Sequence, residues 1–392
     1  MEHVVVVGAG LAGLRSAEAL RAAGHTGRLT VVGTEPHPPY NRPPLSKAAL
    51  TAGVDIAELR FPQRAATGDV HWCLGTSVVA ADLGAGRLTL SDAAELDFDG
   101  LVVATGLRPR RLTLPGPVPG RHVLRTLDDA RALAAELGPG RRLLVVGAGL
   151  VGMELASTAV DLGCPVTVSA PEPVPLLRAL GPEVGGELAR RHADRGGTFL
   201  LGRLPVRYLG ADRVTGVEFD DGSQVAADVV VEAVGSHPEV EWLAGNRIDL
   251  ANGVRTDGHM AVLDTDGRRV QGVVAVGDVA GFPYPRFGGG THRVEHWSLP
   301  TLTGRHAART LLGLEQEPLD LVPTMWTEQA GIRLDGQGLP GLADSWELVQ
   351  GDWATEFHAL GRHGADPVAV LGIGDVRGLI KRGRELGVPS AG

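Results

Sequence analysis

The sequence has few aromatic residues, few cysteines and almost no lysine. Aromatics make up 4% of its 392 residues, and Lys47 and Lys381 are the only lysines among 37 basic residues. The two cysteines, Cys73 and Cys164, form no CxxC pair. This excludes a dithiol redox pair and a four-ligand zinc site, and we expect no metal. The net charge of −9 argues against nucleic acid as the main partner, because phosphate binding needs a basic surface.

Long uninterrupted apolar runs are also missing. The longest apolar stretch, residues 143–160, is broken by three glycines and by Glu154, which indicates a strand, a turn and a helix rather than a membrane span. The chain starts with Met1-Glu2-His3 and has no basic region there. We therefore expect no signal peptide, no membrane partner and a cytoplasmic protein. With 43% hydrophobic residues the chain can bury a large core, and its length fits about two or three domains.

One pattern occurs twice along the chain. A β-branched run at residues 4–7 leads into a GxGxxG turn and then into a helical segment, and residues 143–146 lead into a second such turn. The glycines of the two turns are Gly8, Gly10 and Gly13, and Gly147, Gly149 and Gly152. The first glycine permits the tight turn, the second lets a pyrophosphate approach the backbone, and the third lets the helix pack close to the strand. Two such units predict two dinucleotide sites.

The remaining segments predict a mainly parallel α/β architecture with an additional C-terminal part. Short strands are expected at 76–80, 87–90 and 95–98, and buried strands at 101–104, 228–234 and 273–276. From about residue 319 the pattern changes to alternating strands at 346–350, 354–360 and 367–373, with a helix near 376–386. The sequence therefore predicts an α/β protein with two Rossmann-like βαβ domains and a C-terminal α+β domain.

Several motifs together resemble the ferredoxin reductase family of pyridine-nucleotide flavoproteins, which includes putidaredoxin, rubredoxin and dioxygenase-component reductases. The resemblance covers nearly the whole chain and is weakest near its C-terminus. Besides the two glycine turns, it rests on residues 40–47 (YNRPPLSK), 104–110 (ATGLRPR), 276–278 (VGD), 293–297 (RVEHW) and Trp326. It implies the glutathione-reductase-like flavoprotein fold. The implied domains are an FAD-binding domain at 1–109 and 236–318, an NAD(P)-binding domain at 110–235, and a C-terminal interface domain at 319–392.

The resemblance implies that the first unit binds FAD. Glu35 ends the second strand, where a carboxylate accepts hydrogen bonds from ribose hydroxyls. Arg42 would contact the pyrophosphate, Arg125 the pyrophosphate or the ribityl chain, Asp278 a ribityl hydroxyl, and Trp297 and Trp326 the flavin. The full set implied for FAD is Gly8, Gly10, Leu11, Ala12, Gly13, Glu35, Arg42, Lys47, Val78, Ala104, Thr105, Gly106, Arg125, Gly277, Asp278, His296, Trp297 and Trp326.

The second unit is expected to bind NADH. Its implied contacts are Gly147, Gly149, Leu150, Gly152, Glu154 and Gly235. The family pairs the Glu154 position with Lys47 beside flavin N5, which makes these two residues the predicted catalytic pair; the alternative is an interdomain salt bridge without a redox effect. The acid expected at the end of the second strand is replaced by Ala170, and no arginine stands in its place. Coenzyme preference therefore leans to NADH, with NADPH left open.

The reaction follows from what the chain lacks and from the resemblance. No cysteine lies near the first helix, which excludes disulfide reductase chemistry, and the position of Cys73 excludes a single-cysteine peroxidase mechanism. Hydride uptake from a nicotinamide and electron release from a flavin remain. The family implies a ferredoxin partner, docked near Arg305 and Arg309, that feeds a haem-thiolate monooxygenase or, second, a ring-hydroxylating dioxygenase. The alternatives are an NAD(P)H oxidase or diaphorase that uses oxygen or quinones, and an FAD-binding redox sensor.

Overall fold

The computed structural model describes residues 1–51 and 55–387 of the chain. The chain divides into two compact units, each assembled from three segments. The first unit comprises Met1–Asn41, Leu59–Arg108 and His237–Pro323, and the second comprises Arg42–Glu58, Pro109–Ser236 and Thr324–Gly392. The three domains with boundaries at 110, 236 and 319 stay a prediction, and residues 388–392 of the third lie outside the described residues.

The first unit is built on a six-stranded sheet. In spatial order its strands are β19 (Ala261–Leu263), β20 (Arg269–Ala275), β7 (Gly100–Val103), β1 (His3–Val7), β2 (Arg28–Gly33) and β3 (His71–Leu74). All neighbours are parallel except β19 and β20. The valines of β1 are almost fully buried, as expected for a central strand covered on both faces. The parallel order brings the C-terminal ends of β1, β2, β7 and β20 to one edge of the sheet.

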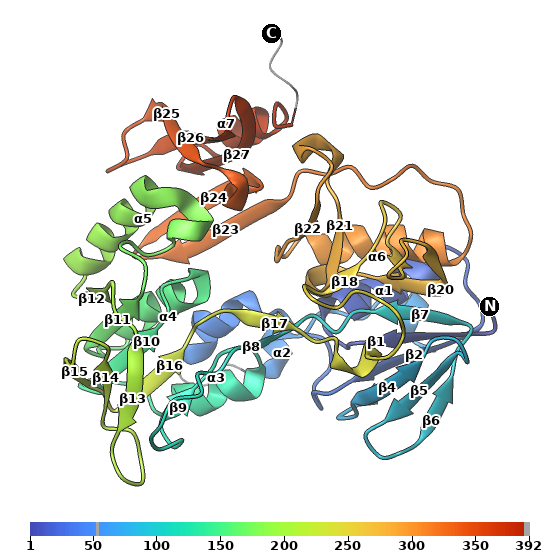
Figure 1. Ribbon diagram of the computed structural model, residues 1–392, viewed down its shortest axis with the longest axis horizontal. Helices are drawn as coiled ribbons and strands as arrows, with labels where there is room; N and C mark the ends of the chain where they lie inside the picture. The colour runs from blue at the N-terminus through green and yellow to red at the C-terminus, as the bar shows by residue number, and fades with distance from the viewer. Residues whose placement is uncertain (52–54, 388–392) are drawn as a thin grey trace. The chain divides into compact units, whose positions relative to one another are not determined.

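Two helices cover one face of this sheet (Figure 1). They are α1 (Leu11–Ala22), which follows the first glycine turn, and α6 (Leu299–Leu311). The two helices pack closely at Gly304, because a Cβ atom there would lie 3.2 Å from the backbone nitrogen of Ser16. Helix α6 is therefore held against the helix that starts at the glycine turn.

Smaller sheets complete the first unit. One is antiparallel, with β4 (Val78–Asp82), β5 (Arg87–Leu90) and β6 (Glu95–Asp97), and the other has β18 (Val254–Arg255), β21 (Ala280–Pro283) and β22 (Thr291–Arg293). A two-stranded sheet pairs β8 (Leu107–Pro109) with β17 (Ser236–Pro238), the two strands at which the chain leaves the first unit and returns to it. The helix α2 (Ile56–Leu59) includes the point at which the chain returns from the second unit to the first.

The second unit contains a five-stranded parallel sheet. Its spatial order is β12 (Thr198–Leu201), β11 (Val166–Ala170), β10 (Leu143–Val146), β16 (Val229–Glu232) and β9 (Arg121–His122). Its helices are α3 (Leu127–Ala134), α4 (Leu150–Asp161) and α5 (Leu177–Asp194). A capping box starts α3: Thr126 accepts a hydrogen bond from the Asp129 backbone, and the Asp129 carboxylate accepts one from the Thr126 backbone.

Two antiparallel sheets make up the rest of the second unit. The smaller has β13 (Pro205–Leu209), β14 (Gly216–Phe219) and β15 (Gln224–Ala226). The larger has the order β23 (Thr324–Gln329), β24 (Ile332–Gly338), β27 (Asp366–Ile373), β26 (Phe357–His363) and β25 (Ser345–Gly351), and α7 (Val376–Gly383) packs on it (Figure 1).

The predicted fold class is confirmed, and the differences concern the ends of elements. The last helix ends at Gly383, where a Cβ atom would collide with the side chain of Gln337, so the helix is shorter than predicted. The strand expected at 354–360 lies at Phe357–His363 instead, because residues 352–355 form a turn closed by the Asp352 carboxylate. Among the described residues, every helix is too short or too polar to cross a bilayer.

Candidate functional site

The first glycine turn lies where β1 meets α1. Gly8 has φ +115°, and a Cβ atom there would collide with the carbonyl of Ala104 at the end of β7. A Cβ atom on Gly13 would likewise collide with the carbonyl of Gly8. A Cβ atom on Gly10 would meet no described atom within 4 Å. The outer glycines are therefore needed for packing, while the middle one faces open space at a helix N-terminus, which suits a pyrophosphate.

The second glycine turn, between β10 and α4, divides its roles in the same way. Gly147 has φ +109° and leaves no room for a Cβ atom beside the carbonyl of Ala233. Gly152 leaves none beside the carbonyl of Gly147, while Gly149 again faces open space. Leu150 is the first residue of α4. Each unit thus contains one turn whose shape fits the phosphates of a dinucleotide.

Other predicted FAD residues of the first unit surround its glycine turn. Ala12 in α1 contacts Gly277, since a Cβ atom on Gly277 would lie 2.9 Å from the Ala12 side chain. Ala104, Thr105 and Gly106 follow β7, and Thr105 Oγ1 donates to the carbonyl of Glu239 at 2.6 Å. Leu11 starts α1, and Val78 starts β4, where it packs against the core below the sheet. The first of these contacts brings the start of α1 next to the turn that follows β20.

Three polar groups of the first unit suit a cofactor. Glu35, just after β2, accepts a hydrogen bond of 2.5 Å from Tyr40, which orients its carboxylate. Asp278 follows β20 and Gly277, and its backbone carbonyl accepts from Arg293. His296 is partly exposed as a residue, but burial of its ring lowers its pKa to about 4, and its buried Nδ1 has no hydrogen-bond partner among the described residues. A buried polar atom of this kind is satisfied when a ligand reaches it.

Trp297 remains accessible next to His296. Its side chain is 41% exposed, and its Nε1 donates to Asn41 Oδ1 at 2.9 Å. This bond restrains the orientation of the ring. A contact of Trp297 with the flavin stays a prediction.

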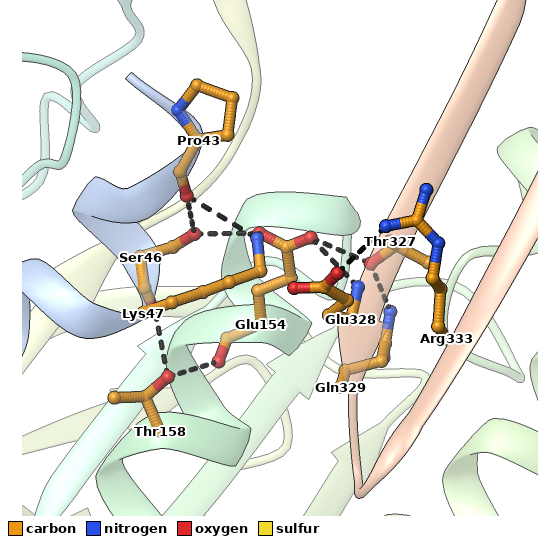
Figure 2. A network of polar contacts seen from close by, with 9 residues as sticks. All are labelled: Pro43, Ser46, Lys47, Glu154, Thr158, Thr327, Glu328, Gln329 and Arg333. Carbon is orange, nitrogen blue, oxygen red and sulfur yellow. Dashed lines mark hydrogen bonds and ion pairs between the residues drawn. The ribbon is translucent and has the colours of Figure 1, made fainter. Parts of the chain in front are cut away.

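The second unit holds the predicted catalytic pair, which is drawn in Figure 2. Lys47 Nζ lies 2.6 Å from Oε2 of Glu154, and the two side chains are 20% and 11% exposed. Glu154 projects from the second turn of α4, and Lys47 follows the short 3₁₀ helix at Pro43–Ser46. Ser46 Oγ donates to the same carboxylate oxygen at 2.7 Å. Thr158, one turn further along α4, donates to the carbonyl of Ser46 at 2.8 Å and ties the two segments together.

The other carboxylate oxygen of Glu154 faces β23. Thr327 Oγ1 donates to Oε1 at 2.8 Å, and the backbone nitrogen of Glu328 lies 3.4 Å from it. Figure 2 shows the carboxylate held between the Ser46–Lys47 side and the Thr327 side. A buried carboxylate is stable only when its oxygens accept hydrogen bonds or face a cation, and both conditions are met here. The arrangement fixes the position of a single ammonium group.

The other predicted cofactor residues of the second unit lie on different segments. Arg42 Nη1 donates to the carbonyl of Arg125 at 2.6 Å, which places the two arginines side by side. Trp326 lies in β23 directly before Thr327, and the Arg333 guanidinium lies 5.5 Å from its ring centre. Gly235 is exposed after β16, with φ +95°. The binding roles of these residues stay predictions.

The structure places two arginines near Ala170 that sequence position alone did not indicate. Arg203 lies beyond β12, and its backbone nitrogen lies 3.3 Å from the carbonyl of Ala170. Arg178 lies in α5 and pairs with Glu172 at 3.0 Å, while Arg203 pairs with Asp221. Each arginine therefore already has a carboxylate partner, which makes its guanidinium group less able to bind the 2′-phosphate of NADPH.

Sequence reasoning paired Glu154 with Lys47 but missed its two hydroxyl partners. Thr327 directly follows Trp326, which belongs to the family motifs, but the sequence does not indicate that Thr327 donates a hydrogen bond to Glu154. Ser46 lies within the Leu-Ser-Lys segment but offered no sign of its partner. A third buried group, Glu232 at the end of β16, pairs with Arg121 at 2.7 Å and accepts a hydrogen bond from Tyr208. No local sequence pattern indicates the contacts that Thr327, Ser46 and Glu232 make.

Comparison with known proteins is consistent with this geometry. The model of a family described as pyridine nucleotide-disulphide oxidoreductase matches residues 2–301. The chain is 37% identical over 359 residues to the ferredoxin–NAD(+) reductase component of the anthranilate 1,2-dioxygenase system of Burkholderia cepacia, covering 89% of this chain and 84% of that protein. It is 35% identical over 341 residues to the ferredoxin reductase component of chlorobenzene dioxygenase of Cupriavidus sp. (strain PS12), covering 86% and 80%.

A similar fold has been solved in complex with a partner. The covalent putidaredoxin reductase–putidaredoxin complex contains a chain with a TM-score of 0.90 and 29% identity, and the match covers 98% of this chain and 92% of that one. These findings confirm the resemblance that the sequence motifs predict.

Proposed function

This chain belongs to the pyridine nucleotide-disulphide oxidoreductase family, and from that membership and its site we propose that it is an NADH-dependent, FAD-containing ferredoxin reductase. The observation that carries the proposal is the presence of one dinucleotide-shaped glycine turn in each unit, with Glu154, the partner of Lys47, on the helix that follows the second turn. The relatives named as ferredoxin reductase components support the same function.

The first unit would hold FAD. Gly10 leaves the space for its pyrophosphate, Glu35 offers a carboxylate for ribose hydroxyls, and Asp278 lies at the end of β20 for the ribityl chain. The buried, unpartnered Nδ1 of His296 supports a ligand at this edge. Bound FAD supplies the chemistry that no side chain here can supply, because it takes up a hydride and releases electrons one at a time.

The second unit would hold NADH at the turn around Gly149. The start of α4 then lies against the coenzyme phosphates, and the second turn of the same helix carries Glu154. Through Glu154 the protein fixes the Lys47 ammonium, and we assign this pair the task of orienting the nicotinamide end. These residues provide position and charge; they act neither as a nucleophile nor as a proton donor or acceptor.

The electron acceptor would be a ferredoxin. Two curated relatives are ferredoxin reductase components of dioxygenase systems, and the similar solved structure is bound to putidaredoxin. The haem-thiolate monooxygenase expected as the terminal enzyme and the cytoplasmic location stay predictions. No observation in the two units favours the oxidase or the sensor over this assignment.

A steady-state assay tests the function. With NADH and purified putidaredoxin as the acceptor, we expect cytochrome c reduction that depends on both. Fast turnover with oxygen or a quinone alone would support an oxidase or diaphorase instead. Negligible turnover with every acceptor, although the flavin is bound, would support a sensor.

A further inference from the structure

A buried histidine of the second unit is connected to the Lys47–Glu154 pair by a chain of hydrogen bonds. His192 lies in α5 and is 3% exposed. Its Nε2 lies 3.0 Å from Oε1 of Gln329, and Gln329 Nε2 donates to Thr327 Oγ1 at 2.9 Å. Thr327 in turn donates to Glu154, and Figure 2 shows the part of this chain from Gln329 to Lys47. All members belong to one compact unit.

The chemistry of these groups fixes the direction of donation. A carboxylate only accepts, so the hydroxyl proton of Thr327 must point to Glu154. Thr327 Oγ1 therefore accepts from Gln329, and the amide nitrogen of Gln329 faces it. The amide oxygen then faces His192, whose Nε2 must carry a proton to donate. The direction is thus the same at every step, from His192 to Glu154.

We propose that His192 is a positioning residue for the Lys47–Glu154 pair, and that it acts by holding Gln329 in one amide orientation. The two orientations of an amide have nearly the same shape, so packing alone does not choose between them. In the flipped orientation the amide oxygen would face Thr327 and would draw its hydroxyl proton away from Glu154. The N–H of His192 opposes that flip because it requires an oxygen opposite it.

The surroundings of His192 suit this role. Burial, ahead of any other cause, lowers its pKa, so the ring is neutral and acts through one N–H. The ring of Phe199 packs edge-on against it at 6.2 Å between ring centres, which restricts its rotation. The amide of Gln329 in the middle of the chain does not titrate. The chain therefore orients Glu154 and does not conduct protons.

The test rests on the proposed function and is a single-turnover measurement of flavin reduction by NADH. The variant His192→Leu is expected to lower the limiting rate constant on the order of tenfold, the scale of one hydrogen bond to a charged group, with the apparent Kd for NADH nearly unchanged. His192→Gln restores an N–H donor and is expected to recover most of the rate. In a Thr327→Val background, His192→Leu should have no further effect, because both changes break the same chain.

A matched control separates positioning from stability. His358 is another buried histidine of the second unit, 1% exposed, and its Nε2 contacts the carbonyl of Asp375. His358→Leu should lower Tm as His192→Leu does but leave the reduction rate unchanged. If His192→Leu lowers Tm and leaves the rate at the wild-type value, or if both leucine variants slow the reaction equally, the proposal is overturned. If wild-type flavin is not reduced by NADH at all, the proposed function fails instead.

Discussion

Lys47 and Glu154 form their ion pair within a single compact unit, with 2.6 Å between Nζ and Oε2. The carboxylate also accepts from Ser46, next to Lys47, and from Thr327 in β23, so its position is fixed by groups from two other segments of the unit. Burying two charged side chains costs desolvation free energy, which is offset only when each charge has a partner. The number of its partners therefore favours a working role over an incidental surface contact.

Loss of this pair should affect the reaction more than cofactor binding. Glu154→Gln or Lys47→Met is expected to slow flavin reduction by NADH, because removing a positioned charge from a sheltered site costs on the order of 2–4 kcal/mol of transition-state stabilisation. Stopped-flow bleaching of the flavin band measures the rate, and the flavin-to-protein absorbance ratio measures binding. Unchanged rates in both variants would leave the pair with a structural role only.

Asp278 should control flavin occupancy. Asp278→Ala is expected to yield protein with strongly reduced FAD content, because the carboxylate at the end of β20 is lost as a hydrogen-bond acceptor. NADH binding by the second unit should persist, and Asp266→Ala, at an exposed turn, should keep normal FAD content. Normal occupancy in Asp278→Ala would refute the assignment.

Coenzyme selectivity should respond to the charges beside β11. Ala170→Glu is expected to sharpen the preference for NADH by roughly 1–2 kcal/mol, because it supplies an acceptor for the ribose hydroxyls. Glu172→Gln should shift kcat/KM toward NADPH, since it releases Arg178 from its present ion pair. Steady-state kinetics with both coenzymes check the two variants. A wild-type preference for NADPH of about tenfold or more would contradict this interpretation.

Ferredoxin docking should depend on the exposed side of α6. Arg305 and Arg309 are both exposed and lie one turn apart, so they present positive charge to an acidic partner although the chain carries a net charge of −9. Arg305→Glu is expected to raise the KM for putidaredoxin and to flatten its salt dependence, with ferricyanide reduction unchanged. Arg268→Glu, at an exposed turn of the same unit, is the control. A parallel fall of both activities would point to damage at the flavin.

The buried pair of Arg121 and Glu232 should be a stability determinant. The two side chains are 8% and 0% exposed, and Arg121→Met would leave the Glu232 carboxylate buried without its cation. We expect a loss of about 3–5 kcal/mol in the free energy of unfolding. The exposed pair of Arg142 and Asp228 is the comparison, where Arg142→Met should cost less than about 1 kcal/mol. Chemical denaturation of the variants measures both, and equal losses would contradict the distinction.

The sequence by itself determined the two dinucleotide turns and the class of fold. A β-branched run, three glycines at fixed spacing and a helical segment are local features, and local backbone geometry dictates their outcome. That is why β1, β10, α1 and α4 lie where the pattern predicts. The observed ends of some strands and of α7 differ from the predicted ends by a few residues, because packing against distant segments sets where these elements stop.

Only the tertiary structure decided which distant side chains meet. His192 and Gln329 are 137 positions apart, and Arg121 and Glu232 are 111 apart. Their contacts depend on β23 lying beside α4 and on β9 lying beside β16. Strand order and helix packing are global results of burying one core, and no periodicity or motif encodes them locally. The glycine turns can therefore be predicted from the sequence, while the hydrogen-bond network that holds Glu154 cannot.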